Sequence, residues 1–279
     1  MNKRNFLKKS LLGLSALALN NPVYSLEIQK KLKPGIILNT LKDDMKSDYR
    51  GTLERLAKLG YKYIESNPYG NDIEAYAKLL RTLGLKTISS GSSIANLEKE
   101  TDQYIRNAHL LGQKYIVAYW PWKSSAENLT KDECLKTADY LNKIGAQLKK
   151  EGIDFAWHNH DKEFRNIGEE KLPFDYLMQE TDPKLVNVQM DVYWVVKGRA
   201  DPITFIKKYP GRFPLFHVKD MDNAEEKNKA CVGEGIIDFE AIFAFSKLAG
   251  LKFPIVEQES NKRGFACAEV SYKNLIKWI

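Results

Sequence analysis

The sequence predicts a single closed (β/α)₈ barrel, in which eight parallel strands alternate with helices. Three observations carry this prediction. Strand-like segments recur eight times, a helix-like segment follows each of them, and successive strands begin about 25 to 40 residues apart. Eight such units occupy about 250 residues, which is the typical size of one barrel.

The eight strand-like segments are short and rich in β-branched and aromatic residues. Along the chain they are Gly35–Asn39, Tyr61–Glu65, Lys86–Ser90, Tyr115–Tyr119, Ile153–His158, Val186–Asp191, Pro214–Val218 and Pro254–Glu257.

Between the strands, apolar residues recur at helical spacing, as in Leu53, Leu56 and Leu59. Glycines such as Gly60 and Gly112 stand where helices should end, just before the next strand. An open, doubly wound sheet is the alternative. It loses its main support because no Gly-x-Gly-x-x-Gly turn follows the first strand.

The composition is that of an ordinary folded protein. Of the 279 residues, 43% are hydrophobic and 28% are charged, while 17 Gly and 10 Pro are too few for a collagen-like or disordered chain. Three cysteines are too few for a disulfide scaffold of this length, and one of them must stay unpaired.

The N-terminus reads as an export signal over residues 1–25, followed by the barrel over residues 26–279. A basic start precedes the nine-residue apolar run Leu11–Leu19, which is too short to span a bilayer but suits a signal-peptide core. Val23-Tyr24-Ser25 predicts cleavage before Leu26. A frayed amphipathic helix is the alternative.

The start Lys3-Arg4-Asn5-Phe6-Leu7-Lys8 is similar to a twin-arginine motif with Lys in place of the first Arg, so both the Tat-like and the Sec route stay open. We expect a periplasmic or secreted protein. No cysteine lies near the cleavage point, so we expect no stable membrane anchor.

Residues 1–25 supply more than half of the net charge of +7. Lys3, Arg4, Lys8 and Lys9 precede the first acid, Glu27, and removing these four charges leaves +3 for the rest of the chain. The barrel has no basic cluster, so we expect no nucleic-acid partner.

Ligand-type side chains gather at the C-terminal strand ends, where barrels of this kind carry their chemistry. Three of the four histidines fall there, namely His158, His160 and His217, whereas His109 lies in a helical stretch. Asp191 ends the sixth strand and Glu257 the eighth. Any one of them alone is more often a solvated or hydrogen-bonded side chain.

Residues two apart on a strand point the same way, so four consecutive strands each offer an inward pair. The pairs are His158 with His160, Asp191 with Tyr193, His217 with Lys219, and Glu257 with Glu259. Imidazoles and carboxylates together predict one divalent metal ion, either Mn²⁺, Co²⁺, Zn²⁺, Fe²⁺ or Mg²⁺. With no thiolate among them, open positions for a substrate are expected.

Five motifs follow one another along the later strands. They are Trp157-His158-Asn159-His160-Asp161, Asp191-Val192-Tyr193-Trp194, His217-Val218-Lys219-Asp220, Gly233-Glu234-Gly235 with Asp238, and Val256-Glu257-Gln258. Together, in this order, they resemble the sugar phosphate isomerase/epimerase family, the xylose-isomerase-like TIM barrels, and the resemblance covers about residues 30 to 279.

The resemblance implies one metal held on strands five to eight, often by Glu, Asp, His and Glu. By position this points to His158, Asp191, His217 and Glu257, with His158 in place of the usual first Glu. His160 and Glu259 are the runners-up as ligands. Ser90-Gly91-Ser92-Ser93 stands where many relatives carry a His.

A metal that chelates a carbonyl and a neighbouring hydroxyl acidifies the carbon between them. We therefore expect an isomerase or epimerase of a sugar or keto-sugar that works through an enediolate. A lyase or dehydratase acting on a keto-sugar or 3-keto-glycoside is the alternative, as is a sugar-binding barrel without catalysis. A nuclease needs more metal ligands than four histidines leave room for.

His160, Lys219 and Glu65 are the candidate acid/base groups, and the small-molecule carbohydrate should contact the aromatic rim through Tyr193, Trp194 and Trp122. A surface lysine, a solvated carboxylate and simple aromatic packing are the respective alternatives. Neither the sugar, the metal nor the oligomeric state follows from the sequence.

Overall fold

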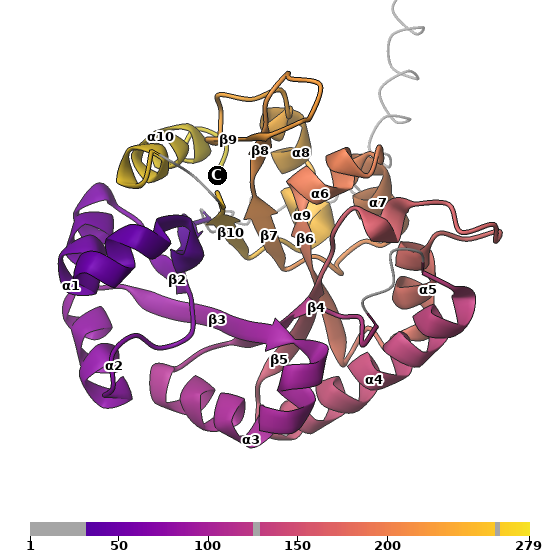
Figure 1. Cartoon of the computed structure of the whole chain (residues 1–279), viewed down its shortest axis with the longest axis horizontal. Helices are drawn as coiled ribbons and strands as arrows, with labels where there is room; N and C mark the ends of the chain where they lie inside the picture. Colours follow the sequence, from indigo (N-terminus) through magenta and orange to yellow (C-terminus); the bar gives the residue numbers. More distant parts are fainter. Residues whose placement is uncertain (1–31, 125–128, 260–262) are drawn as a thin grey trace, which may run out of the picture. The chain divides into compact units, whose positions relative to one another are not determined.

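A computed structural model describes residues 32–124, 129–259 and 263–279. Within these residues eight parallel strands close into a barrel in the order β1-β10-β7-β6-β5-β4-β3-β2. Figure 1 shows the helices on the outside of this barrel. The predicted (β/α)₈ fold is therefore confirmed, while the predicted signal peptide over residues 1–25 lies outside the described residues.

The strands lie close to where the sequence pattern predicts them. Those of the barrel are β1 (Gly35–Ile37), β2 (Tyr63–Glu65), β3 (Lys86–Ser93), β4 (Tyr115–Trp120), β5 (Asp154–His158), β6 (Val186–Asp191), β7 (Leu215–Val218) and β10 (Phe253–Val256). A two-stranded hairpin of β8 (Asp220–Met221) and β9 (Lys229–Ala230), which the sequence pattern did not predict, follows β7.

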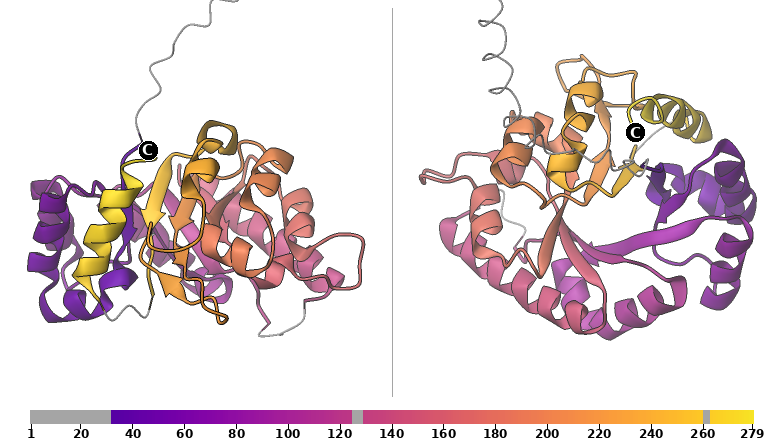
Figure 2. Two further views of the ribbon diagram at one scale, coloured as in Figure 1. Left: turned by 90° about the horizontal axis from the view of Figure 1, so that it is seen from above. Right: turned by 180° about the vertical axis from the view of Figure 1, so that it is seen from behind.

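The helices of the described residues vary widely in length. They are α1 (Lys42–Leu59), α2 (Ile73–Thr82), α3 (Ile94–Leu111), α4 (Lys131–Lys150), α5 (Pro173–Glu180), α6 (Val192–Lys197), α7 (Pro202–Lys208), α8 (Phe239–Phe243), α9 (Ser246–Ala249) and α10 (Phe265–Leu275), with 3₁₀ turns at Leu38–Leu41 and Lys162–Phe164. In both views of Figure 2 the C-terminal helix α10 lies beside α1, which it contacts. None of these helices is both long and apolar enough to cross a membrane.

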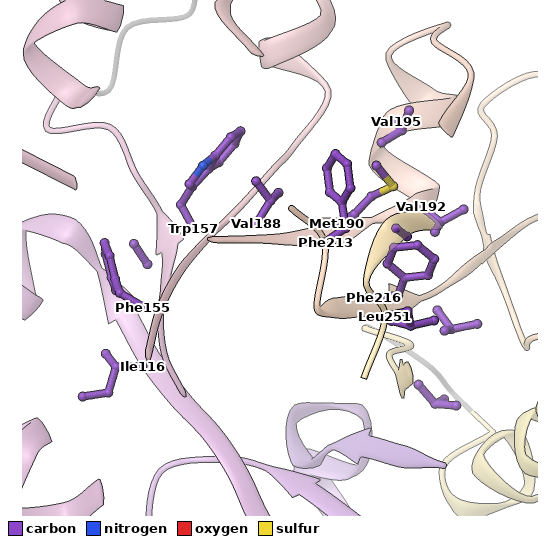
Figure 3. Packing of buried hydrophobic residues seen from close by; sticks show 14 of the residues in the cluster. Ile116, Phe155, Trp157, Val188, Met190, Val192, Val195, Phe213, Phe216 and Leu251 are labelled. Carbon is purple, nitrogen blue, oxygen red and sulfur yellow. The ribbon is translucent and has the colours of Figure 1, made fainter. Parts of the chain in front are cut away.

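Side chains alternate along each strand between the helices and the barrel interior. On β5, Phe155 and Trp157 belong to the large cluster that packs against the helices, part of which Figure 3 shows, whereas Ala156 belongs to a smaller, separate cluster. His158, two residues beyond Ala156, therefore faces the interior at the C-terminal mouth. The same alternation places His217 two residues beyond Leu215 and gives the mouth its polar layer.

The segment after β7 folds around the carboxylate of Asp220. This carboxylate accepts hydrogen bonds from the backbone N–H groups of Met221, Gly233, Gly235 and Ile237. A Cβ on Gly235 would lie 2.2 Å from Asp220 Oδ1, so the loop can close this tightly only with glycine there.

A disulfide joins this segment to α10 through Cys231 and Cys267, while Cys134 is the free, buried cysteine. Because the two bonded residues are 36 positions apart, the bridge restricts a sizeable loop of the unfolded chain.

Replacing both Cys231 and Cys267 by serine should lower the free energy of unfolding by roughly 3 kcal/mol, through the lost chain restraint. Chemical denaturation of the non-reduced protein measures this. A thiol titration of the unfolded wild type should find one free thiol before reduction and three after it. Three thiols before reduction would contradict the bridge.

Candidate active site

Seven buried polar side chains form a closed ring of contacts at the C-terminal mouth of the barrel. Each contacts the next at 2.6 to 3.6 Å, and each is at most 4% exposed. Strands β2, β5, β6 and β7 and the segments after β7 and β10 supply them. This polar ring consists, in order of contact, of Glu65, His217, Glu257, Lys219, Asp191, His158 and Gln189.

Glu65 sets the orientation of its neighbours. Its Oε2 accepts from Gln189 Nε2 at 2.7 Å and from the Ser89 hydroxyl, and the hydroxyl of Tyr119 also hydrogen-bonds to it. A carboxylate only accepts, so Gln189 must turn its amide towards Glu65 and its Oε1 towards His158.

Gln189 in turn fixes the tautomer of His158. Its Oε1 lies 2.9 Å from His158 Nδ1, so that nitrogen carries the proton and Nε2 keeps its lone pair. Burial, reinforced by His217, lowers the pKa of His158 well below its usual range, so the ring is neutral. Its Nε2 lies 3.6 Å from Asp191 Oδ2, as two ligands of one metal can.

His217 contacts a carboxylate with each ring nitrogen. Nε2 lies 2.6 Å from Glu65 and Nδ1 lies 3.0 Å from Glu257. Burial alone would lower the pKa of His217, but the two carboxylates outweigh it and raise the pKa to about 10. His217 can bind a metal only after it loses one of these protons.

The ammonium of Lys219 neutralises the opposite side of the polar ring. It lies 2.8 Å from Glu257, 3.3 Å from Asp191 and 3.6 Å from Glu259, and the side chain is fully buried. Burial lowers the pKa of Lys219, yet these carboxylates raise it overall, so the group is held as a cation. Burial raises the pKa of Asp191 to about 6, against the pull of Lys219.

The donor set fits a divalent metal ion. One donor atom each of His158, Asp191 and His217 lies within 4.8 Å of the others. The polar ring has three carboxylates against the two cations Lys219 and His217, which leaves one negative charge. A divalent ion that displaced the His217 proton would leave the ring neutral.

Glu257, the fourth predicted ligand, lies differently from the other three. It does not join the group of mutually close donors among the described residues, and it contacts His217 Nδ1 and Lys219 instead. A carboxylate on the far nitrogen of a ligating histidine orients the ring and raises its basicity. Glu257 thus lies beside His217 and Lys219, and its role as a direct metal ligand stays a prediction.

His160 and Trp194 border the polar ring. Their rings lie 5.3 Å apart, and His160 lies 4.9 Å from His158. His160 Nδ1 and Trp194 Nε1 are buried without a partner among the described residues, so both can serve a ligand. Burial and the charge of Lys219 lower the pKa of His160 to about 4, which makes it a neutral group.

The other two predicted aromatic contacts also have partners within the fold. The hydroxyl of Tyr193 donates to the Lys227 carbonyl at 2.8 Å and holds the hairpin, while Lys219 lies 5.5 Å from the centre of its ring. Trp122 is 2% exposed and donates its indole N–H to Glu163, which also accepts from the His160 backbone. Glu163 thus holds Trp122 within the fold, and the contact of Trp122 with a sugar stays a prediction.

The serines of the third strand take local roles. Ser93 caps helix α3, Ser92 accepts from Asn96, and Ser90 donates to Gln113. A Cβ on Gly91 would lie 1.9 Å from the Val117 carbonyl, so the close approach of β3 to β4 requires glycine.

Sequence reasoning missed Gln189, Ser89 and Glu163. Gln189 could have been predicted from the sequence, because it stands two residues before Asp191 and so shares its face of β6. Glu163 gave no comparable signal, since its partner Trp122 is 41 residues away.

The family model described as xylose isomerase-like TIM barrel matches residues 53–278. The chain belongs to this family. As the resemblance implied, a sugar phosphate isomerase/epimerase from Parabacteroides distasonis is a close structural match, with a TM-score of 0.76, 26% identity, and coverage of 90% of this chain and 95% of that one.

Two further proteins are similar to the chain, one in sequence and one in fold. An inosose dehydratase from Clostridium botulinum is 26% identical over 254 residues, which cover 76% of this chain and 84% of that protein. The IolI protein, whose structure contains a bound zinc atom, shares the fold with a TM-score of 0.69 and 17% identity, over 88% of this chain and 96% of that one.

Substitutions in the polar ring should separate metal ligands from their partners. His158→Ala and Asp191→Asn each remove a donor, so the purified proteins should retain no divalent metal. Glu257→Gln should weaken metal binding by roughly 10- to 100-fold without abolishing it, because it removes an orienting contact. Elemental analysis and titration with Zn²⁺ and Mn²⁺ measure both effects.

Asp201→Asn, at the exposed cap of α7, is the matched control and should bind metal like the wild type. Complete loss of metal in Glu257→Gln would make Glu257 a direct ligand. Full metal content in Asp191→Asn would contradict the assignment of the site.

Proposed function

We propose that the protein is a metal-dependent lyase that eliminates an oxygen substituent β to the carbonyl of a keto-sugar or related keto-polyol. The observation that carries this proposal is the pairing of a carboxylate base with an ammonium acid in one polar ring. When bound, the metal would polarise the carbonyl and stabilise the negative charge that develops on its oxygen.

Glu65 is the base in this proposal. It lies in a hollow of 230 Å³, where Tyr119 lies next to it and the side chains of Asn39, Asn67 and Tyr69 offer hydrogen bonds. Its carboxylate removes the proton from the carbon next to the carbonyl.

Lys219 is the acid. Its ammonium gives a proton to the oxygen that leaves from the following carbon, so that the C–O bond breaks as the C=C bond forms. An elimination needs one group that accepts a proton and another that gives a proton to the leaving oxygen, and the polar ring supplies both.

The substrate should carry no phosphate at the hollow beside Glu65. Its eight lining residues include no lysine or arginine, which a phosphate normally requires. Hydroxyl groups of a neutral sugar match the amides and phenols that line it.

The named relatives support the choice of reaction. The similarity to an inosose dehydratase favours loss of water from a cyclic polyol ketone. The similarity to a sugar phosphate isomerase/epimerase keeps isomerisation or epimerisation through an enediolate as the second candidate function. A sugar-binding barrel without catalysis is less favoured, because a buried acid and base would then serve no purpose.

We also propose that the protein is exported, as its basic and apolar N-terminus predicts. The disulfide between Cys231 and Cys267 supports this, because such bonds persist in oxidising compartments and are rare in the cytosol. The exported protein should lack residues 1–25 and begin at Leu26. Fractionation followed by mass measurement checks this, and a full-length cytosolic protein would contradict it.

Glu65→Gln and Lys219→Gln should fail at different points of the reaction. Without the base, both proton exchange at the carbon next to the carbonyl and elimination should fall at least 100-fold. Without the acid, the proton should still exchange with deuterated solvent while elimination falls. Nuclear magnetic resonance follows the exchange, and the absorbance of the unsaturated ketone follows the elimination.

Lys143→Gln, on the exposed side of α4, is the control for the lysine variant, and circular dichroism checks that each variant is folded. If the wild type exchanges the proton and releases an isomer with no unsaturated product, the second candidate function replaces the first.

A further inference from the structure

A second and larger hollow lies on the Lys219 side of the polar ring. Its volume is 510 Å³, and α6, the β8–β9 hairpin and the segment after β10 contribute to it. Glu259 lines it and lies 3.6 Å from Lys219, so the hollow borders the acid of the proposed reaction. The hollow beside Glu65 borders the base.

One wall of this second hollow has an unsatisfied hydrogen-bonding group. Gln258 lines the hollow and is 5% exposed, yet its side-chain Oε1 is buried without a partner among the described residues. Trp194 Nε1 is likewise buried and unpartnered, and its ring lies 5.7 Å from the Lys229 ammonium at the edge of the hollow. Of the two, Gln258 lines the hollow, and a buried acceptor that lacks a partner there points to a ligand that donates a hydrogen bond to it.

Several charged side chains of the wall already have partners. Lys229 pairs with Glu259, Arg263 pairs with Glu234, and Lys197 donates to backbone carbonyls of the hairpin turn. With Glu226 and Lys227 the lining has four cations against three carboxylates, so its net charge is only +1 and its many polar groups suit a hydroxyl-rich ligand.

We propose that this hollow is a second sugar subsite, which holds a hydroxyl-rich ring attached to the reacting ring through the oxygen that leaves. The substrate class is then a keto-glycoside of at least two rings. This inference rests on the proposed function. In the step, Glu65 takes the proton, the glycosidic C–O bond breaks, and the second ring leaves as an alcohol with the proton from Lys219.

The first test compares two substrates on the wild-type enzyme loaded with metal. One is a glucosyl-glucose disaccharide with a ketone on its non-reducing ring, and the other is the corresponding single-ring ketone of glucose. We expect kcat/KM to be at least roughly tenfold higher for the disaccharide, as one added hydrogen-bonded contact provides. Equal values for the two compounds would overturn the subsite.

The second test removes the unpartnered acceptor. Gln258→Leu keeps the size of the side chain and should lower the ratio of the two kcat/KM values roughly tenfold. Gln103→Leu, the same change on the exposed face of α3, is the matched control and should leave the ratio unchanged. An unchanged ratio in Gln258→Leu, or an equal loss for both compounds, counts against the subsite.

Binding separates this inference from the proposed function. If neither compound is turned over, the proposed function fails, and saturation-transfer nuclear magnetic resonance with the same disaccharide then tests the subsite alone. Saturation of both rings, reduced for the second ring in Gln258→Leu, supports it. Saturation of one ring only overturns it.

Discussion

The closed polar ring is the constraint on which the rest of the site depends. Each of its charges is buried, and a buried charge is tolerated only when neighbours compensate it. Removing one member of a buried pair costs about 3–5 kcal/mol, because the partner is left unpaired. The strand ends that meet at the mouth must therefore carry groups of opposite charge or matching hydrogen-bonding capacity. A substitution of Glu65 on β2 would leave His217 on β7 without one of its two carboxylate partners.

The ring also explains why one site can bind a metal and hold a lysine nearby. His158 is kept neutral, and Gln189 aims its lone pair at the space beside Asp191. Lys219 lies on the other side of Asp191, where it offsets Glu257 and Glu259. The metal donors and the ammonium thus share one carboxylate without occupying the same position.

Much of the fold and part of the site follow from local sequence patterns. The strand-like segments and their alternation place His158, Asp191 and His217 at one end of the barrel, because both features depend on near neighbours. Contacts between distant segments have no such signal. The pairing of Cys231 with Cys267, the hairpin after β7 and the indole bond of Trp122 to Glu163 all depend on how separate βα units pack. Glu257 is the clearest example. Its place at the end of a strand predicts that it lies at the mouth of the barrel, but not that its partners there are His217 and Lys219.

The proposed base and the proposed acid belong to one ring, so their charge states cannot be tuned independently. Glu65 and Lys219 are linked through His217 and Glu257, so a proton gained or lost at one end changes the field at the other. Because His217 donates to both carboxylates, a metal that displaced one of its protons would take away a hydrogen bond from Glu65 or Glu257. The proposed metal site and the proposed base therefore depend on the same contacts of His217 at the barrel mouth.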